Sequence, residues 1–215
     1  MAKLLILGAG GHGKVVADIA LMMNKWEHIA FLDDKEGLQE IGNIPIIGRL
    51  EDYALFKEEF QYAFIAIGKN RLRLKWFEHL SQEGFIIPTI IHPFSSISKF
   101  SKIGAGTVVM GGVVINAGTS IGNACIINTS SSIDHDCVLA DAVHISPGVN
   151  VGGTVNIGQC TWVCIGSRIV NNVDIGCNAV VAAGTAVINA VPNNVLVAGV
   201  PAIIKKRFEM IENES

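Results

Sequence analysis

The sequence is poor in charged and aromatic residues, and it lacks a hydrophobic run long enough to span a membrane. Charged residues make up 16% of its 215 positions and aromatic residues 7%, although half of all positions are hydrophobic. Gly, Asn, Ser or Asp interrupts the apolar stretches every few positions, so none approaches the roughly 20 residues that a spanning helix requires. The opening apolar run, residues 4–7, ends at Gly8 and is too short for the core of a signal peptide. We therefore expect a soluble, cytoplasmic protein.

A basic surface and a disulfide framework are also missing. The formal net charge is −3 and the isoelectric point is near 6.1, which provides no positive field for nucleic acid or anionic lipid. The five cysteines are odd in number and contain no CxxC pair, so a disulfide set or a zinc knuckle is not expected. We predict reduced, mostly buried thiols and no metal site.

What the sequence has in abundance is a six-residue repeat. Every sixth position from Ile97 to Val187 is Ile, Val or Leu, and a small or β-branched residue follows four positions later in each repeat. A period of six fits neither a helix nor a plain strand, but it suits a short strand followed by a tight bend. Three such strands make a triangular coil of 18 residues, and stacked coils bury one another's inner faces. The repeat therefore predicts a parallel β-helix, although the spacing leaves its handedness open.

The first ninety residues have a different pattern. Residues 3–13, KLLILGAGGHG, combine a buried strand with a glycine turn, and a helix and a second strand ending at Asp33 and Asp34 follow. The glycines match GxGxxG, an arrangement in which backbone N–H groups at a helix start can bind phosphate. Three interpretations remain open: an NAD site, a Rossmann-like fold without a ligand, and a nucleotide-sugar site. We favour the last because the unit is too short for a full dinucleotide-binding fold.

The segment before the repeats completes this α/β unit. YAFIAIG, residues 62–68, predicts a third strand, and NRLRLKWFEHLSQEG predicts an amphipathic helix that ends at Gly84. GFIIPTIIHP, residues 84–93, then predicts a further strand of the same unit, closed by Pro93. We predict a Rossmann-like nucleotide-sugar-binding domain at 1–94, a β-helix acyltransferase domain at 95–204 and a C-terminal tail at 205–215.

The motifs together resemble a known family. GAGGHG, FLDD, AIG followed by Asn70 and Arg71, IHP, NTSS…HD and GVPA occur in this order over nearly the full length. The chain resembles hexapeptide-repeat nucleotide-sugar acetyltransferases, which include sialic-acid O-acetyltransferases and N-acetyltransferases of UDP-4-amino sugars. The resemblance implies a left-handed β-helix and a homotrimer that binds the acceptor and acetyl-CoA between neighbouring prisms. It implies acetyl-CoA as co-substrate and no metal, with GVPA and the basic residues after it capping the helix near the coenzyme.

The resemblance also assigns binding residues. It implies that the acceptor's UDP contacts Gly10, Gly11 and His12, with the uracil near Asp33 and Asp34 and with Gly68 lining the same pocket. His12 fits a role in orienting ligand or backbone better than a catalytic one, and Asp34 could simply be solvated. Contacts with acetyl-CoA are implied for His144, Ile165 and Ala183. Some members of the family have Gly at Cys164 and Ala183, so this part of the coenzyme site departs from the pattern.

The stretch SSIDHD, residues 131–136, supplies the candidate catalytic pair. Acyl transfer from a thioester needs a general base, for which histidine is suited, and the repeats contain only His135 and His144. His135 falls at a bend, where Asp136 could fix its tautomer and raise its basicity. The family has His followed by an acid, which implies His135 as base and Asp136 as its partner. On spacing alone Asp134 could also be that partner, so its role stays open. His144 is expected at a different corner of the coil.

These features predict an acetyl-CoA-dependent N-acetyltransferase that acts on the 4-amino group of a UDP-linked sugar in bacterial glycan biosynthesis. An O-acetyltransferase acting on a sialic-acid-type sugar is the nearest alternative. A zinc carbonic anhydrase on the same prism would need three His ligands, which the two repeat histidines could provide only by sharing across a trimer. A nucleotide-sugar binder without catalytic activity is the third alternative.

Overall fold

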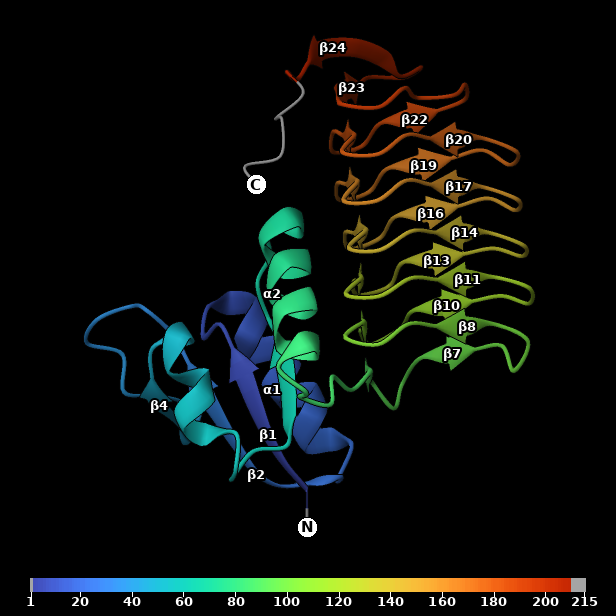
Figure 1. Cartoon of the computed structure of the whole chain (residues 1–215). Helices are drawn as coiled ribbons and strands as arrows, with labels where there is room; N and C mark the ends of the chain where they lie inside the picture. The colour runs from blue at the N-terminus through green and yellow to red at the C-terminus, as the bar shows by residue number, and fades with distance from the viewer. Residues whose placement is uncertain (1, 210–215) are drawn as a thin grey trace.

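The computed structural model describes residues 2–209 and contains two parts that pack side by side (Figure 1). An α/β domain forms from the first ninety residues, and a tall prism of stacked coils forms from the repeats. Helix α2 (Asn70–Gln82) stands between them with its axis along the prism.

The α/β domain is built on a five-stranded sheet with β1 next to the edge strand β5. The sheet order is β3-β4-β2-β1-β5, and all neighbours are parallel except β3 and β4. Both faces of the sheet are covered, which explains why the β1 sequence is an unbroken apolar run. The remaining elements are β1 (Ala2–Leu7), α1 (Gly11–Met22), β2 (Trp26–Leu32), β3 (Glu40–Ile41), β4 (Ile44–Gly48), a 3₁₀ helix (Leu50–Phe56) and β5 (Tyr62–Ile65).

The strands predicted at β1, β2 and β5 and both predicted helices are present. The β3–β4 hairpin was not predicted. Its turn residues Gly42 and Asn43 both have positive φ, at 56° and 67°, as a two-residue hairpin turn requires.

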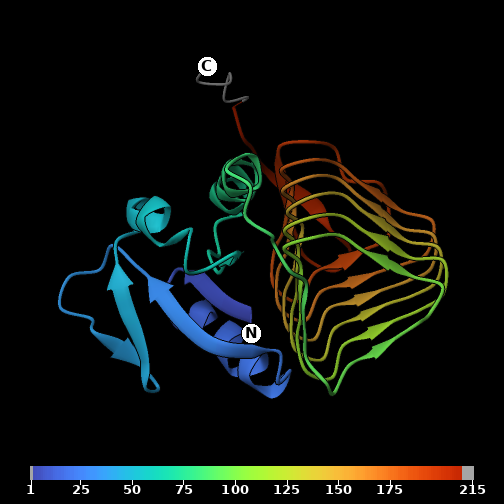
Figure 2. The same ribbon diagram turned by 60° about the horizontal axis from the view of Figure 1, so that its bottom comes forward.

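The prism is the predicted left-handed parallel β-helix, with three sheets around one apolar core (Figure 2). Each repeat strand has two residues, and the second is the predicted aliphatic residue. From Val109 to Val187 these residues are at most 4% exposed. Many bends contain a residue with positive φ, which Gly and Asn adopt at low cost.

The three sheets differ in length. The first is β7 (Ser96–Ile97), β10 (Val114–Ile115), β13 (Ser132–Ile133), β16 (Asn150–Val151), β19 (Arg168–Ile169) and β22 (Ala186–Val187). The second is β8 (Lys102–Ile103), β11 (Ser120–Ile121), β14 (Val138–Leu139), β17 (Asn156–Ile157) and β20 (Asp174–Ile175). The third, called the domain-facing sheet below, is β6 (Ile90–Ile91), β9 (Val108–Val109), β12 (Ile126–Ile127), β15 (His144–Ile145), β18 (Trp162–Val163), β21 (Val180–Val181), β23 (Val195–Ala198) and β24 (Ile203–Arg207).

The α/β domain packs on the lower coils of the domain-facing sheet. One apolar cluster joins residues of α1, such as Val16 and Ile19, with the outward side chains of Val108 and Ile126. These two prism residues are at most 1% exposed, although they point away from the prism core. The two domains therefore share buried apolar surface.

Two segments differ from the sequence-based expectations. GFIIPTIIHP is not one strand of the α/β domain, because Ile86 bridges Tyr62 in that sheet whereas β6 already pairs with β9 in the prism. Residues 205–207 belong to β24 rather than to a separate tail, and the rest of that predicted tail from 210 onward lies outside the described residues. The division at residue 94 stays a prediction.

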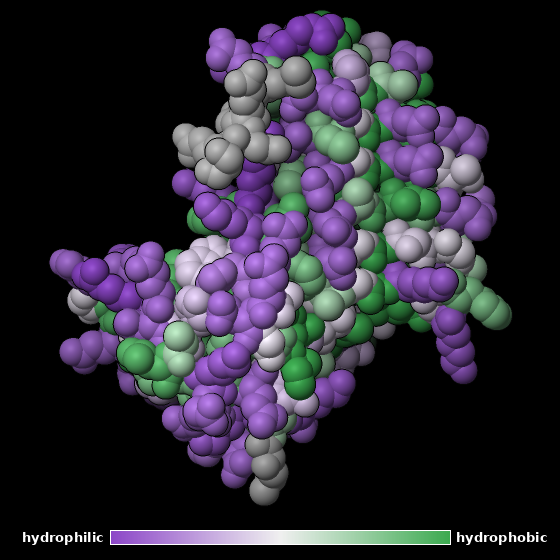
Figure 3. Space-filling view, in the orientation of Figure 1, coloured by the Kyte–Doolittle hydropathy of each residue, from purple (hydrophilic) through white to green (hydrophobic). Residues whose placement is uncertain are grey.

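None of the helices within residues 2–209 combines the length and apolarity required to cross a membrane. Figure 3 shows a largely hydrophilic surface on the α/β domain, with apolar side chains interspersed among polar ones along the prism.

Candidate active site

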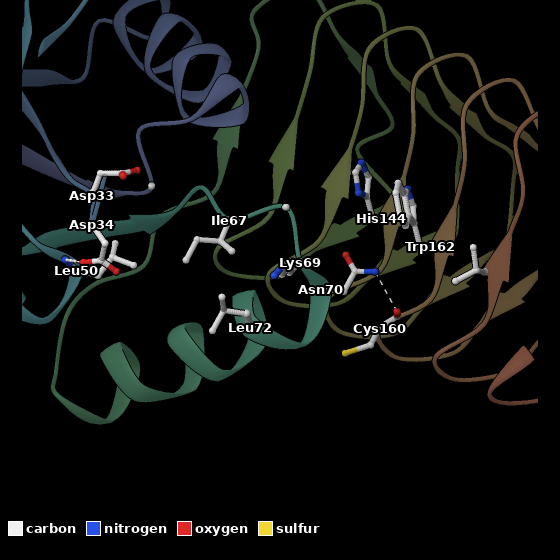
Figure 4. A pocket seen from close by; sticks show the side chains of 13 residues that line it. Asp33, Asp34, Leu50, Ile67, Lys69, Asn70, Leu72, His144, Cys160 and Trp162 are labelled. Carbon is white, nitrogen blue, oxygen red and sulfur yellow. Dashed lines mark hydrogen bonds between the residues drawn. The ribbon is translucent and has the colours of Figure 1, made fainter. Parts of the chain in front are cut away.

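A pocket of about 950 Å³ lies where the α/β domain meets the prism (Figure 4). Gly8 follows β1, Asp33 and Asp34 follow β2, and Gly68 lies just beyond β5, so the pocket sits at the carboxyl ends of three parallel strands. β2 and β5 lie on opposite sides of β1, so the strand order changes direction here. α/β sheets commonly bind ligands at such a point, at the carboxyl ends of the strands. The pocket is lined by Gly8, Asp33, Asp34, Leu50, Ile67, Gly68, Lys69, Asn70, Leu72, His144, Cys160, Trp162 and Val180.

The two carboxylates after β2 have different surroundings. Asp33 accepts the backbone N–H of Ala9 at 2.6 Å and that of Lys35 at 2.8 Å, so it holds the glycine turn in place. Asp34 is exposed and accepts the backbone N–H of Leu50 through one oxygen, at 3.1 Å. Asp34 therefore keeps more capacity to accept a hydrogen bond from a ligand than Asp33 does.

One glycine of this turn allows close packing of helix and strand, whereas two others face open space. A Cβ on Gly13 would lie 2.1 Å from the carbonyl oxygen of Gly8, so this glycine allows α1 to approach β1 closely. Gly10 and Gly11 are exposed, and a Cβ on either would meet nothing within 4 Å. The space predicted for a phosphate is thus open in front of the first turn of α1, although neither glycine lines the pocket itself.

His12 lies behind this turn with its Nε2 atom buried and without a hydrogen-bond partner among the described residues. Burial, and next the positive charge of Arg73, lower its pKa to about 4. The imidazole is therefore neutral at physiological pH, in keeping with a ligand-orienting or structural role rather than a basic one.

The prism contributes His144, Trp162 and Val180 to the opposite wall. These residues occupy the outward positions of β15, β18 and β21, directly above the positions of Val108 and Ile126 in the same sheet. The rings of His144 and Trp162 stack with centroids 5.7 Å apart and 10° between their planes. The outward ladder thus changes from aliphatic residues under α1 to a stacked pair where the pocket opens.

The predicted corner position of His144 is wrong, because the residue lies within β15. The error arose because a nine-residue step from His135 is half a coil, which passes the next corner and reaches the following strand. Burial, then the charges of Arg73 and His12, lower the pKa of His144 to about 3, and its Nε2 atom is buried without a partner among residues 2–209. His144 is consequently a weak base.

Trp162, Lys69 and Leu50 line the pocket but were not predicted from the sequence. Trp162 carried a usable signal, since it lies 18 residues after His144 and so occupies the same outward position one coil later. Leu50 carried no such signal because the hairpin that precedes it was not predicted.

His135 and Asp136 lie at the bend between β13 and β14, as predicted, with both side chains exposed. The Nδ1 atom of His135 is 2.9 Å from Oδ2 of Asp136. This hydrogen bond, then the charge of Asp134, raises the pKa of His135 above its ordinary value. With Nδ1–H donated to the carboxylate, Nε2 is free to accept a proton.

The hydrogen bonds of Asp134 indicate a structural role for this residue, which the sequence had left open. Its Oδ1 atom accepts the Nδ2–H of Asn116 and the backbone N–H of His135, each at 2.8 Å. The Asn116 bond is also the main reason that the pKa of Asp134 is lowered. Asp134 therefore fixes the bend, whereas Asp136 contacts the imidazole.

Two glycines in neighbouring coils make room for the pair. A Cβ on Gly153 would lie 2.6 Å from Cε1 and Nε2 of His135, and one on Gly118 would lie 2.2 Å from Oδ1 of Asp136. A larger side chain at either position would displace the ring or the carboxylate. The bend thus holds the His-Asp pair between two backbone surfaces, with the imidazole accessible to solvent.

The catalytic candidates are not in the pocket of their own chain. The bend of His135 joins the two sheets other than the domain-facing one, and Figure 2 shows the α/β domain against that third side. Ile165 and Ala183 are exposed on the bends after β18 and β21, the strands that carry Trp162 and Val180. One chain therefore brings Asp33, Asp34, Gly68 and His144 together in the pocket, whereas Ile165, Ala183 and His135 lie outside it.

Among residues 2–209, no three His, Cys, Asp or Glu side chains are grouped in a way that could hold a metal ion. His135 and His144 belong to different parts of the coil. The described chain offers no assembled zinc site of its own.

This fold, a short Rossmann-like domain docked on a left-handed β-helix, is shared by solved sugar acetyltransferases of bacteria. Residues 3–80 match the PglD N-terminal domain family. The acetyltransferase domain of PglB from Neisseria gonorrhoeae in complex with acetyl coenzyme A superimposes with a TM-score of 0.90 at 36% identity, covering 94% of this chain and 98% of that one. PerB from Caulobacter crescentus in complex with CoA and GDP-perosamine superimposes with a TM-score of 0.91 at 35% identity, covering 96% and 98%.

A curated relative agrees with these structures. UDP-N-acetylbacillosamine N-acetyltransferase of Bacillus subtilis is 36% identical over 121 residues, which is 51% of this chain and 52% of that protein. The match therefore spans about half the length of this relative, whereas the structural matches are nearly complete. The chain belongs to the family of nucleotide-sugar N-acetyltransferases.

Proposed function

We propose that the protein transfers the acetyl group of acetyl-CoA to the 4-amino group of a UDP-linked amino-deoxy sugar, with His135 as general base. The observation that carries this proposal is the hydrogen bond of 2.9 Å between His135 and Asp136 at an exposed bend. His144, the histidine that lines the pocket, is by contrast a weak base. Two of the relatives support the amine as acceptor: one is named UDP-N-acetylbacillosamine N-acetyltransferase, and the structure of PerB contains the amino sugar of GDP-perosamine.

The chemistry requires few groups. The neutral amine attacks the thioester carbonyl carbon while Nε2 of His135 accepts the amine proton, and Asp136 stabilises the imidazolium that forms. The carbon–sulfur bond then breaks, and the proton passes from His135 to the CoA thiolate. The products are an amide and free CoA. His144, Ile165 and Ala183 are proposed to contact the coenzyme, while Gly10, Gly11, His12, Asp33, Asp34 and Gly68 are proposed to contact the acceptor.

A complete site in this proposal needs a second copy of the chain. His135 and the pocket lie on different sides of one prism, so the base of one subunit would serve the pocket of its neighbour in a homotrimer. Gly68→Trp would fill the pocket without a clash at its Cβ, which meets nothing within 4 Å. We expect Gly68→Trp and His135→Ala to be inactive separately but to regain about one quarter of wild-type activity when co-expressed, because random assembly pairs an intact pocket with an intact base. A co-expressed mixture as inactive as its parents would contradict a shared site.

The raised pKa of His135 makes a prediction about pH. A general base must be unprotonated, so kcat/KM should fall as the pH drops through a pKa above 6.5. Asp136→Asn removes the main cause of the raised pKa, so we expect the acidic limb of the profile to move to lower pH. The maximal rate should also fall, because an amide stabilises the imidazolium less than a carboxylate does. An acidic limb that stays in place would show that another group controls it.

The nucleotide can be tested directly. A thiol-release assay with acetyl-CoA against UDP-, GDP- and dTDP-linked amino sugars and free sialic acid is expected to show one strongly preferred UDP-linked acceptor. A GDP-linked 4-amino sugar is the second candidate, favoured by the full-length similarity to PerB, whose structure contains GDP-perosamine. Turnover of sialic acid alone would favour O-acetylation, and the absence of turnover with every acceptor would overturn the enzymatic proposal. The cytoplasmic location stays a prediction.

A further inference from the structure

Arg73 is the largest fully buried side chain among residues 2–209, at 1% exposure, and it lies in the first turns of α2 between the two domains. It makes no ion pair with a carboxylate among residues 2–209. A buried guanidinium without a counter-charge is costly unless all its donors are used. Its five N–H groups do find five oxygen acceptors, and their origin suggests what the residue does.

The acceptors come from both domains. On one side, Nη1 donates to the carbonyl oxygens of Ile67 and Gly68, at 3.0 and 3.2 Å. On the other, Nε donates to the carbonyl of Ala124 at 2.7 Å and Nη2 to that of Ala142 at 3.0 Å. Ala124 and Ala142 occupy equivalent bends in successive coils, both with positive φ. One side chain therefore joins the pocket loop to two layers of the prism.

Asn70 extends the same connection. Its Oδ1 atom accepts the fifth donor, Nη2 of Arg73, at 2.9 Å, while its Nδ2 donates to the carbonyl of Cys160 at 3.0 Å. Cys160 is the equivalent bend residue of the next coil, with φ of 58°. Three successive coils thus accept hydrogen bonds from one turn of α2, and Asn70 itself lines the pocket.

The pocket loop depends on this network for its position. Gly68 is exposed and has no side chain to anchor it, and its carbonyl bond to Arg73 joins it to the prism. Loss of the guanidinium would leave several partly buried carbonyls without a donor and would free the loop from the wall that carries His144 and Trp162. We propose that Arg73 is a positioning residue that holds the acceptor loop against the prism and so sets the width of the nucleotide-sugar pocket. The proposal rests on the proposed function for the identity of the ligand.

The test compares three variants of the full-length protein. Arg73→Met removes the charge and the hydrogen bonds, and Arg73→Lys keeps a charge but cannot reach all five acceptors. Arg71→Met is the matched control, since Arg71 lies on the same helical turn and binds Asn178 of the same corner, at 3.1 Å, but does not contact the loop. Calorimetric titrations with UDP, GDP and acetyl-CoA measure binding, and hydrogen exchange of residues 66–70 measures the order of the loop.

We expect Arg73→Met to weaken binding of the preferred nucleoside diphosphate at least tenfold, and Arg73→Lys to weaken it less, with acetyl-CoA affinity nearly unchanged. Loop exchange should accelerate in both, whereas Arg71→Met should bind and exchange like the wild type. If Arg73→Met does not fold, the lysine variant decides through the same two measurements. A folded Arg73 variant with wild-type exchange and nucleotide affinity would overturn the inference. A wild type that binds neither UDP nor GDP, while the variants still show faster loop exchange, would count against the proposed function alone.

Discussion

We expect His135→Ala to lower kcat by about two to four orders of magnitude, with the KM values of both substrates changed little. This is the usual size of the effect when a general base is lost, because the amine must then lose its proton to water. The imidazole is exposed and lies beside Gly153, outside the core, so its removal leaves no cavity there. Steady-state kinetics with the preferred acceptor measures the loss, and circular dichroism checks the fold.

His92 provides the matched control for this substitution. It also lies beyond a strand of the prism and packs beside a glycine, with a Cβ on Gly111 placed 3.4 Å from its ring. Its Nδ1 accepts the backbone N–H of Phe94 at 2.9 Å, and it does not line the pocket. His92→Ala should therefore keep near-normal turnover. Near-normal turnover of His135→Ala would remove that residue from the mechanism.

We expect Gly13→Ala to destabilise the α/β domain by about 3 kcal/mol or more, the upper part of the range for overpacking. Alanine favours a helix over glycine by about 0.5–1 kcal/mol, but the new Cβ would lie 2.1 Å from the carbonyl oxygen of Gly8. The steric cost exceeds the gain in helix propensity, because the Gly8 carbonyl is backbone and the Cβ is fixed to the backbone of α1, so α1 must move away from β1. Thermal denaturation should show a midpoint lowered by about 6–12 °C, at about 2–4 °C per kcal/mol for a protein of this size.

The substitution Gly11→Ala separates the effect of helix propensity on stability from the steric effect. Gly11 is also in α1, yet a Cβ there would meet nothing within 4 Å, so only the helix propensity changes. We expect this variant to be as stable as the wild type or slightly more stable. If both alanine variants melted alike, the close approach of helix and strand would not explain the third glycine of the motif.

Much of the fold could be predicted from the sequence because each coil repeats the same pattern of inward-facing aliphatic residues. Aliphatic residues such as Ile133 face inward every six positions, and any other period would expose them. The same arithmetic placed His135 and Asp136 at a bend. It did not distinguish Asp134 from Asp136 as the partner of His135, since that choice depends on side-chain contacts such as the one between Asp134 and Asn116.

The contacts between the domains were harder to predict. No local sequence pattern predicts that the first turn of α2 contacts the bends at Ala124 and Ala142, because such contacts depend on how the two domains dock. Arg73 is a charged residue of the predicted amphipathic helix, yet its side chain is buried between the docked domains. The outward ladder of the domain-facing sheet did contain usable information, since an 18-residue step connects His144 with Trp162.

The last strand has a consequence for how the molecule behaves at high concentration. A stack of parallel coils presents an unpaired strand edge at its end, and an open edge of this kind can recruit further chains into fibrous aggregates. At the top of the prism β24 runs antiparallel to β23 and so breaks the pattern that another coil would continue (Figure 1). Its exposed Lys205, Lys206 and Arg207 place like charges along that edge, where an identical end would be repelled. The reversal of β24 thus ends the parallel pairing in the domain-facing sheet, and its charges disfavour the addition of another chain there.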